Sequence, residues 1–151
     1  MSFWNHKQSN AWRIYVDAAV RAERGQCGLA VIVRDERGAV RQWFGARTGR
    51  LTNNEAEYAA AILALQQLRH EAHRPWLLCS DSQILVHQMQ GKAATHSREL
   101  QRQQLELRRL VTEFKSLRFE HIPREQNRLA DALANEVVDG ESPAGAFTND
   151  R

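Results

Sequence analysis

The chain has 151 residues, of which 42% are hydrophobic, and a formal net charge of +3. This length suits one domain, which buries roughly two-thirds of its unfolded surface, and the basic excess is compatible with polyanionic partners. The opening "MSFWNHKQSNAW" lacks a signal-peptide core, and no stretch approaches the ~18 apolar residues of a membrane span. Cys27 and Cys79 lie far apart in apolar runs, which favours reduced thiols. We therefore expect a cytoplasmic protein without membrane contact.

The first half of the chain predicts three strands and a helix. The strands are expected at residues 12–19, 27–35 and 39–47, and "DERG" between the second and third is a hairpin-turn signal. The helix is expected from about residue 52 to 70. It starts at "TNNEAEY", where Thr52 and Glu55 have the spacing of a capping box, in which each side chain binds the other residue's backbone N–H.

The second half predicts strands and helices in alternation. "PWLLCSD" is short and continuously apolar, as in a strand buried on both faces. Asn127 is the expected N-cap of the last helix. The order predicts an α/β fold with one mixed sheet and helices on both faces. The expected divisions are a flexible start at 1–10, a single domain at 11–138 and a mobile tail at 139–151. In the second half of the domain we expect a short helix ending at Gly91, a cationic helix at 97–115, a strand at 116–122 and a last helix ending at 138.

Two of the predicted strands end on aspartate. A strand that follows a helical crossover usually returns parallel to an earlier strand and often beside it. If "PWLLCSD" lies beside "WRIYVDAA", then Asp17 and Asp81 meet at the edge where open α/β sheets place their ligands. Because acids at the ends of apolar strands are costly unless a cation neutralises them, this pair is a candidate site.

Two helical acids join this pair. Glu55 and Glu57 are two positions apart and point to nearly opposite sides of a helix, so the capping role of Glu55 leaves Glu57 to face the sheet beside small alanines. On the last helix Asp131 lies at the margin of an apolar stripe. Taken singly, each acid is explained as well by a cap, a turn or a surface charge. Together they suit Mg²⁺ or Mn²⁺, which prefer oxygen ligands.

At these residues the chain resembles type 1 ribonuclease H of the RNase H-like superfamily. The resemblance rests on "YVDAA", "TNNEAEY", "CSDSQ" and "REQNRLADALAN", in the family's order, and spans about residues 12–138. It implies a five-stranded sheet, three antiparallel strands followed by two parallel ones, in the order 3-2-1-4-5. The implied activity is endonucleolytic cleavage of the RNA strand of an RNA/DNA hybrid, with two Mg²⁺ or Mn²⁺ ions in the substrate complex, leaving 5′-phosphate and 3′-hydroxyl ends.

The resemblance also assigns residues. The family's metal-ligand acids fall on Asp17, Glu57, Asp81 and Asp131, and its substrate-binding amides fall on Asn53, Asn54 and Gln83. An amide both donates and accepts hydrogen bonds, which suits the base edges and 2′-hydroxyls of a hybrid's minor groove.

The chain departs from the family in three places. "AAVRAERGQ" replaces a glycine-rich loop after the first aspartate, and its Arg21 and Arg24 are expected to be solvated or to contact phosphate. "HIPREQN" lacks the loop histidine of several bacterial members and offers Arg124 or Glu125 instead. The basic protrusion and the amino-terminal hybrid-binding module of some members are not expected, so the cations predicted to grip the DNA strand are Lys92, Arg98 and Arg102.

The main prediction is a monomeric ribonuclease H. The two alternatives that the sequence leaves open are a non-catalytic nucleic-acid-binding module of the same fold and a two-metal nuclease with another nucleic-acid substrate. Four acids facing phosphates argue against the first, while the altered first loop keeps the second open.

Overall fold

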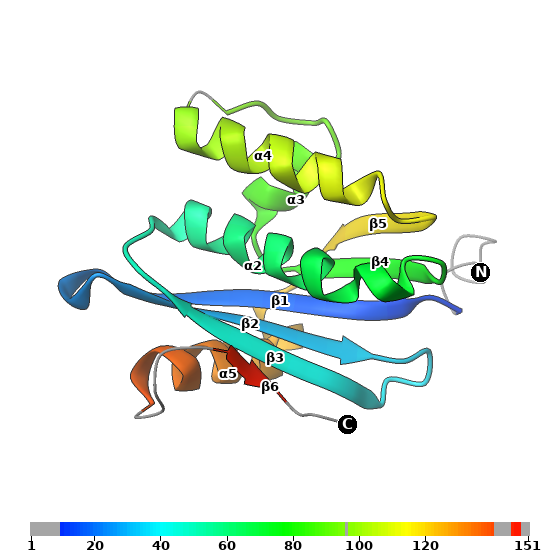
Figure 1. The fold of residues 1–151 in the computed structure, drawn as a ribbon, viewed down its shortest axis with the longest axis horizontal. Coiled ribbons are helices and arrows are strands. Elements are labelled where there is room, and N and C mark those ends of the chain that lie inside the picture. The colour runs from blue at the N-terminus through cyan, green and yellow to red at the C-terminus, as the bar shows by residue number, and fades with distance from the viewer. Residues whose placement is uncertain (1–9, 96, 141–145, 149–151) are drawn as a thin grey trace.

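A mixed sheet with helices on both faces forms the protein (Figure 1). The computed structural model describes residues 10–95, 97–140 and 146–148. The strands are β1 (Trp12–Arg21), β2 (Gln26–Arg34), β3 (Val40–Thr48), β4 (Pro75–Ser80), β5 (Ser116–His121) and β6 (Ala146–Thr148). The helices are α2 (Asn53–Leu68), α3 (Gln83–Met89), α4 (Arg98–Val111) and α5 (Arg128–Asp139), with short 3₁₀ turns η1 (Ala22–Arg24), η2 (Arg69–Glu71) and η3 (Arg124–Gln126).

The sheet has the order β5-β4-β1-β2-β3-β6. β1, β2 and β3 form an antiparallel meander, whereas β4 pairs parallel with β1 and β5 pairs parallel with β4. This confirms the predicted order of five strands, including the return of the fourth strand beside the first. β4 is buried along all but its first residue, as its uninterrupted apolar run predicts.

A sixth strand is the main difference from the predicted sheet. Residues Ala146–Thr148 pair antiparallel with β3 over Phe44 to Ala46, so part of the expected mobile tail extends the sheet. The expected flexible start, residues 1–10, and the rest of that tail after Gly140 lie outside the described residues, except for Asn10. No helix in the described ranges is long and apolar enough to cross a membrane.

The upper layer in Figure 1 holds α2 against the sheet, with α4 above α2. α2 starts at the predicted capping box: the Thr52 N–H donates to Glu55 Oε1 at 2.9 Å, and the Glu55 N–H donates to Thr52 Oγ1 at 3.2 Å. The buried Tyr58 hydroxyl donates to Gln88 Oε1 at 2.6 Å, which joins α2 to α3. The rotation of α2, and hence the direction of each of its side chains, is therefore fixed at two points.

The lower layer is α5, which lies against the backbone of β2 (Figure 1). A Cβ atom at Gly28 would come within 2.3 Å of the Ala134 carbonyl oxygen and 2.9 Å of the Val138 nitrogen. Only glycine allows this approach, because both neighbouring atoms belong to the helix backbone and cannot rotate away. Gly28 therefore sets the height of α5, and of every residue on it, above the sheet.

We expect Gly28→Ala to lower the free energy of unfolding by about 3 kcal/mol, at the upper end of overpacking effects, because the helix backbone must move. Urea unfolding measures this change. Gly49→Ala is the matched control, since a Cβ there meets nothing within 4 Å and a change within about 0.5 kcal/mol is expected. Equal midpoints for the two variants would contradict the close seating of α5.

Candidate active site

Strand register brings the first two acids together. In the parallel pair β1 and β4, the last paired residues are Val16 and Ser80. Asp17 and Asp81 follow them directly, so the two aspartates lie side by side where the β1–β4 pairing ends. Asp17 is only 5% exposed. The prediction that these two strand ends adjoin is confirmed by this register.

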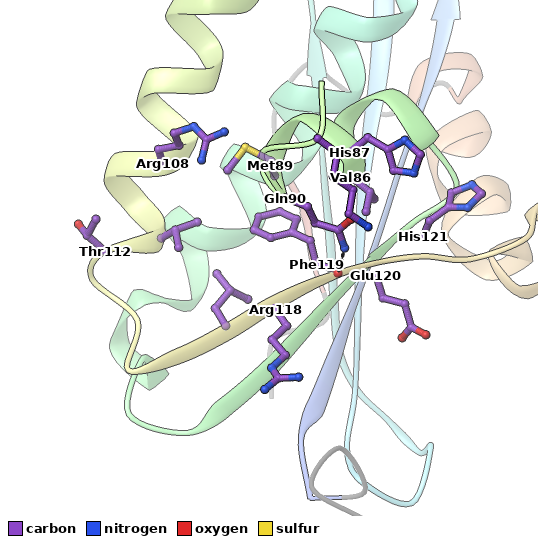
Figure 2. Close-up of a pocket in the computed structure, with 13 residues that line it drawn as sticks. Val86, His87, Met89, Gln90, Arg108, Thr112, Arg118, Phe119, Glu120 and His121 are labelled. Carbon is purple, nitrogen blue, oxygen red and sulfur yellow. Dashed lines mark hydrogen bonds between the residues drawn. The ribbon is translucent and has the colours of Figure 1, made fainter. Parts of the chain in front are cut away.

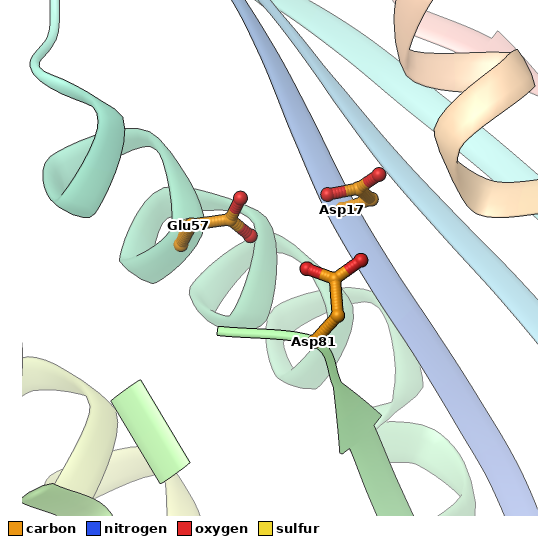
Figure 3. Close-up of side chains that lie close together, drawn as sticks. All are labelled: Asp17, Glu57 and Asp81. Atoms are coloured by element: carbon orange, nitrogen blue, oxygen red, sulfur yellow. The ribbon is translucent and has the colours of Figure 1, made fainter. Parts of the chain in front are cut away.

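Glu57 completes a group of three carboxylates. Each of Asp17, Glu57 and Asp81 offers one oxygen, and these oxygens lie within 4.8 Å of one another. Figure 3 shows the three side chains converging from β1, α2 and the end of β4. Glu55, by contrast, is committed to the capping box. Helix α2 therefore turns one of its two glutamates toward the sheet edge and keeps the other at its start, as predicted.

The carboxylates disfavour one another's ionisation. Burial, followed by the charges of Asp17 and Asp81, raises the pKa of Glu57 to about 9. Burial and the charge of Asp81 raise the pKa of Asp17 to about 7. Both effects act against the charged form, because a buried carboxylate loses hydration and its neighbours carry the same sign.

The fourth predicted acid lies beside this group. Asp131 on α5 is exposed and is not one of the three convergent carboxylates. It nevertheless lies near Asp17, since after the larger effects of burial and Asp81, interaction with Asp131 also raises the pKa of Asp17. Its position is therefore peripheral, at the side of the cluster that faces α5.

Asn127 precedes α5 at the predicted N-cap position, and its side chain has a further role. Its side chain makes no capping hydrogen bond to α5. Instead its Nδ2 donates to the Val16 carbonyl oxygen at 2.9 Å and to Asp81 Oδ2 at 3.3 Å, and the residue is only 1% exposed. Asn127 is therefore the N-cap residue of α5, as predicted, but its side chain binds β1 and Asp81 instead of capping the helix. Asn127 thus holds Asp81 in place, and only its spacing of four residues before Asp131 could have drawn attention to it.

The donor set fits a hard divalent cation. All convergent groups are carboxylate oxygens, the ligand type that Mg²⁺ and Mn²⁺ prefer. Glu57 Oε1 is buried and accepts no hydrogen bond from the described part of the chain. A buried oxygen without a donor is costly, and a bound cation would supply the missing partner.

The predicted substrate amides flank the cluster at two helix starts. Asn53 is exposed and Asn54 half-buried on the first turn of α2, four and three residues before Glu57 respectively, so they lie one turn from it along the helix. Gln83 is exposed at the first position of α3, two residues after Asp81. On η3, the positive charge of Arg124 lowers the pKa of Glu57 and so acts on the cluster, whereas Glu125 is an exposed neighbour.

The predicted basic residues are spread over a wider surface. Lys92 lines an open pocket between α3, α4 and β5, together with His87, Arg108 and His121 (Figure 2). Arg98 is exposed at the first position of α4. Arg102 pairs with Glu99 at 2.7 Å on the outer surface of α4. These three residues therefore do not converge on one point.

The two arginines of the first loop, Arg21 and Arg24, both pair with the end of α5. Arg21 contacts Asp139 at 2.7 Å and Asn135 at 2.6 Å, and Arg24 also pairs with Asp139. Hydrogen bonds from both arginines lower the pKa of Asp139 to about 2. Arg24 remains exposed, in line with the expected solvated loop charge, whereas Arg21 is half-buried by these contacts. The contact with α5 itself was not predicted, since more than a hundred residues separate its two sides.

Three strand-end and helix carboxylates at the edge of a mixed sheet of this order define a protein of the ribonuclease H-like class. The family model described as "Reverse transcriptase-like" matches residues 15–137, and the chain belongs to that family.

Relatives of known structure agree. Ribonuclease HI of Halobacterium salinarum is 35% identical over 125 residues, and the crystal structure of RNase H1 from the same organism superposes with a TM-score of 0.79 over 84% of this chain and 96% of that chain. LC11-RNase H1, isolated from compost, is 35% identical with a TM-score of 0.80, covering 86% of this chain and 96% of its own. LC11-RNase H1 has also been solved in complex with an RNA/DNA hybrid.

Some curated relatives are longer than this chain. The match covers 63% of the Halobacterium ribonuclease HI and 38% of the Bifunctional protein Rv2228c of Mycobacterium tuberculosis, which is 28% identical over 138 residues, 91% of this chain. The N-terminal RNase H domain of Rv2228c superposes with a TM-score of 0.78 at 28% identity, over 85% of this chain and 94% of that chain. The match with Rv2228c thus corresponds to one domain of a longer relative.

The raised pKa values predict how stability depends on pH without metal. Asp17 and Glu57 bind protons more tightly in the folded chain, with pKa values of about 7 and about 9, than in the unfolded chain, where the ordinary pKa values are 3.8 and 4.5. The folded state therefore holds more protons between these limits, and stability falls as pH rises from about 4 to about 9. In EDTA, Glu57→Gln should raise the melting temperature increasingly over this window.

Thermal unfolding at a series of pH values measures this difference. Glu36→Gln is the control, because Glu36 is exposed in the β2–β3 turn, and its melting temperature should follow the wild type at every pH. A Glu57→Gln difference that stays constant from pH 5 to pH 9 would contradict the raised pKa of Glu57.

Proposed function

We propose that this protein is an endoribonuclease that cleaves the RNA strand of RNA/DNA hybrids by metal-dependent phosphodiester hydrolysis, leaving 5′-phosphate and 3′-hydroxyl ends. The observation that carries the proposal is the group of three carboxylates within 4.8 Å of one another, with the pKa values of Asp17 and Glu57 raised. Perturbed pKa values cluster at functional sites, so carboxyl groups with raised pKa values at a sheet edge mark a candidate functional site. The likeness to ribonucleases H supplies the reaction class.

In this proposal Asp17 and Asp81 are the central ligands of two Mg²⁺ or Mn²⁺ ions. Glu57 is the ligand next to the substrate, and Asp131 is a peripheral ligand that can change its position. Two such ions, held by these acids, would supply the chemistry of activating water and stabilising a leaving oxygen. The protein's own contribution is rigidity: the β1–β4 register fixes two carboxylates, the capping box fixes the direction of Glu57, and the Asn127 amide orients Asp81.

Substrate recognition is assigned to the two helix starts. Asn53, Asn54 and Gln83 would read the minor groove of the hybrid, where amides can both donate to base-edge acceptors and bind 2′-hydroxyls. Their exposure beside the cluster supports this assignment. Contact with the 2′-hydroxyl is what distinguishes an RNA strand from DNA.

The basic residues Lys92, Arg98 and Arg102 would contact phosphates of the DNA strand. Arg102 is paired with Glu99 at the surface, but exposed ion pairs contribute only about 0–1 kcal/mol. A phosphate can therefore replace Glu99 as the partner of Arg102 at little cost in free energy. Arg124 would serve as an auxiliary group beside the substrate in place of a loop histidine, a role that its influence on Glu57 supports. Glu125, its neighbour, is the second candidate for this role.

The proposed state is a monomer in the cytoplasm. Cys27 and Cys79 are both buried free thiols, which a reducing compartment preserves.

The carboxylate assignment predicts that Asp81→Asn abolishes cleavage. Loss of one outer partner of a metal ligand typically lowers activity ~10–100-fold, so loss of the ligand's charge should exceed that range. The substitution retains the side-chain volume and an oxygen that can accept from Asn127, so the melting temperature and hybrid affinity, measured by fluorescence anisotropy, should be preserved. Glu36→Gln is again the control. Undiminished cleavage by Asp81→Asn would overturn the assignment.

The substrate class is tested with four matched nucleic acids. RNA/DNA hybrid, duplex RNA, duplex DNA and single-stranded RNA are each incubated with Mg²⁺, with Mn²⁺ and with EDTA, and products are resolved after end-labelling. We expect cleavage of the hybrid alone, in its RNA strand and only with metal. Cleavage of another substrate would indicate a two-metal nuclease of different specificity, and binding without cleavage would indicate a non-catalytic module.

A further inference from the structure

Three polar residues form one line along α5. Asp131, Asn135 and Asp139 follow each other at intervals of four residues, so they lie on the same side of the helix. The Asn135 Nδ2 donates to the Asp131 carbonyl oxygen at 2.8 Å and reaches its carboxylate Oδ1 at 3.4 Å. The acid that lies beside Asp17 therefore has a hydrogen-bond donor on its own helix.

Arg21 fixes the orientation of that donor. Its Nη2 donates to Asn135 Oδ1 at 2.6 Å, so the oxygen side of the amide faces the arginine and the NH₂ side faces Asp131. A rotated amide would place its oxygen against a carboxylate and its NH₂ against a guanidinium, and both contacts repel. Arg21 is in turn held by Asp139, which accepts from its Nε at 3.0 Å and its Nη2 at 2.7 Å.

The end of α5 is anchored independently of Asn135. Arg47 on β3 donates to the carbonyl oxygens of Val137 at 3.1 Å and Gly140 at 3.0 Å. Arg24 pairs with Asp139 and donates to the Val138 carbonyl oxygen at 3.5 Å. Cations at a helix C-terminus are favourable because they bind its unpaired carbonyls and oppose its negative dipole end. The seat of the helix and the direction of the Asn135 amide are therefore separable by mutation.

We propose that Asn135 and Arg21 are positioning residues, a relay in which Arg21 orients the Asn135 amide and that amide holds the Asp131 carboxylate toward the metal site. The inference rests on the proposed function, since it concerns the peripheral ligand of that site. Asp131 is exposed, so without a donor its carboxylate samples several rotamers and fewer of them face Asp17. Arg21 stands in the segment that replaces the family's glycine-rich loop, and it acts on the active site indirectly, through Asn135.

The first test is Asn135→Ala. Alanine is the better helix former, so a loss of function in this variant is not explained by a weaker helix. We expect affinity for Mn²⁺, titrated by calorimetry without nucleic acid, to fall by about tenfold or more, the range for loss of a ligand's outer partner. The kcat for hybrid cleavage should fall similarly while KM is retained, because no substrate contact is removed. Arg21→Gln should give a smaller loss of the same kind.

Arg24→Gln is the matched control. It removes one contact to Asp139 and leaves the bonds of Asn135 in place, so the melting temperature should fall while Mn²⁺ affinity equals that of the wild type. In an Asp131→Asn background, Asn135→Ala should cause no further loss of Mn²⁺ affinity, because the carboxylate that it positions is gone.

Two results would overturn the relay: wild-type Mn²⁺ affinity in Asn135→Ala, or the same fractional loss with and without Asp131. Failure of the proposed function itself looks different, since the wild type would then bind Mn²⁺ but leave the hybrid uncut. A wild type that binds no Mn²⁺ would reject the metal site and the relay together.

Discussion

The crowding of three carboxyl groups at one sheet edge is the constraint on which the rest of this structure depends. Asp17, Glu57 and Asp81 each place an oxygen within 4.8 Å of the others, although burial and neighbouring charges raise the pKa of Asp17 and of Glu57. Such a group would separate unless stronger interactions fixed the backbone behind it. The parallel register of β1 and β4 and the capped, doubly anchored α2 provide that restraint. The fold can therefore be understood as a support that keeps like charges close until cations neutralise them.

The support comes from both faces of the sheet. On the α2 face, Glu57 approaches from a helix whose start is fixed by two reciprocal hydrogen bonds. On the other face, Asn127 ties Asp81 to the β1 backbone, and α5 is seated on β2 at Gly28. The capping box is local, but the contacts of Asn127 and Gly28 join residues distant in sequence, so the acidic cluster depends on the tertiary structure as well as on one segment.

Sequence patterns predicted the parts of the site that depend on local rules. Asp17 and Asp81 end apolar strands, and the capping box sets the rotation of Glu57, so simple topology and helix geometry were sufficient. The position of Asn127 at the start of α5 was predicted, but its side-chain contacts were not, because capping is a local preference, whereas its side-chain partners lie on β1 and after β4. Two further contacts were missed for the same reason: that of Arg21 with α5 and the pairing of Ala146–Thr148 with β3. In both cases the partner lies far away in the sequence, so no local pattern indicates it.

The close seating of α5 at Gly28 also sets the timescale of motion at Asp131. Because the backbone of the helix touches the backbone of β2, α5 cannot slide or tilt toward the cluster without breaking that contact. Displacement of Asp131 is then confined to rotation about its side-chain bonds, and exposed side chains exchange rotamers in picoseconds to nanoseconds, whereas helix and domain movements take microseconds to milliseconds. Rotation of this carboxylate is consequently far faster than a typical enzyme turnover of about 10 per second, so under the proposed function it would not limit the rate.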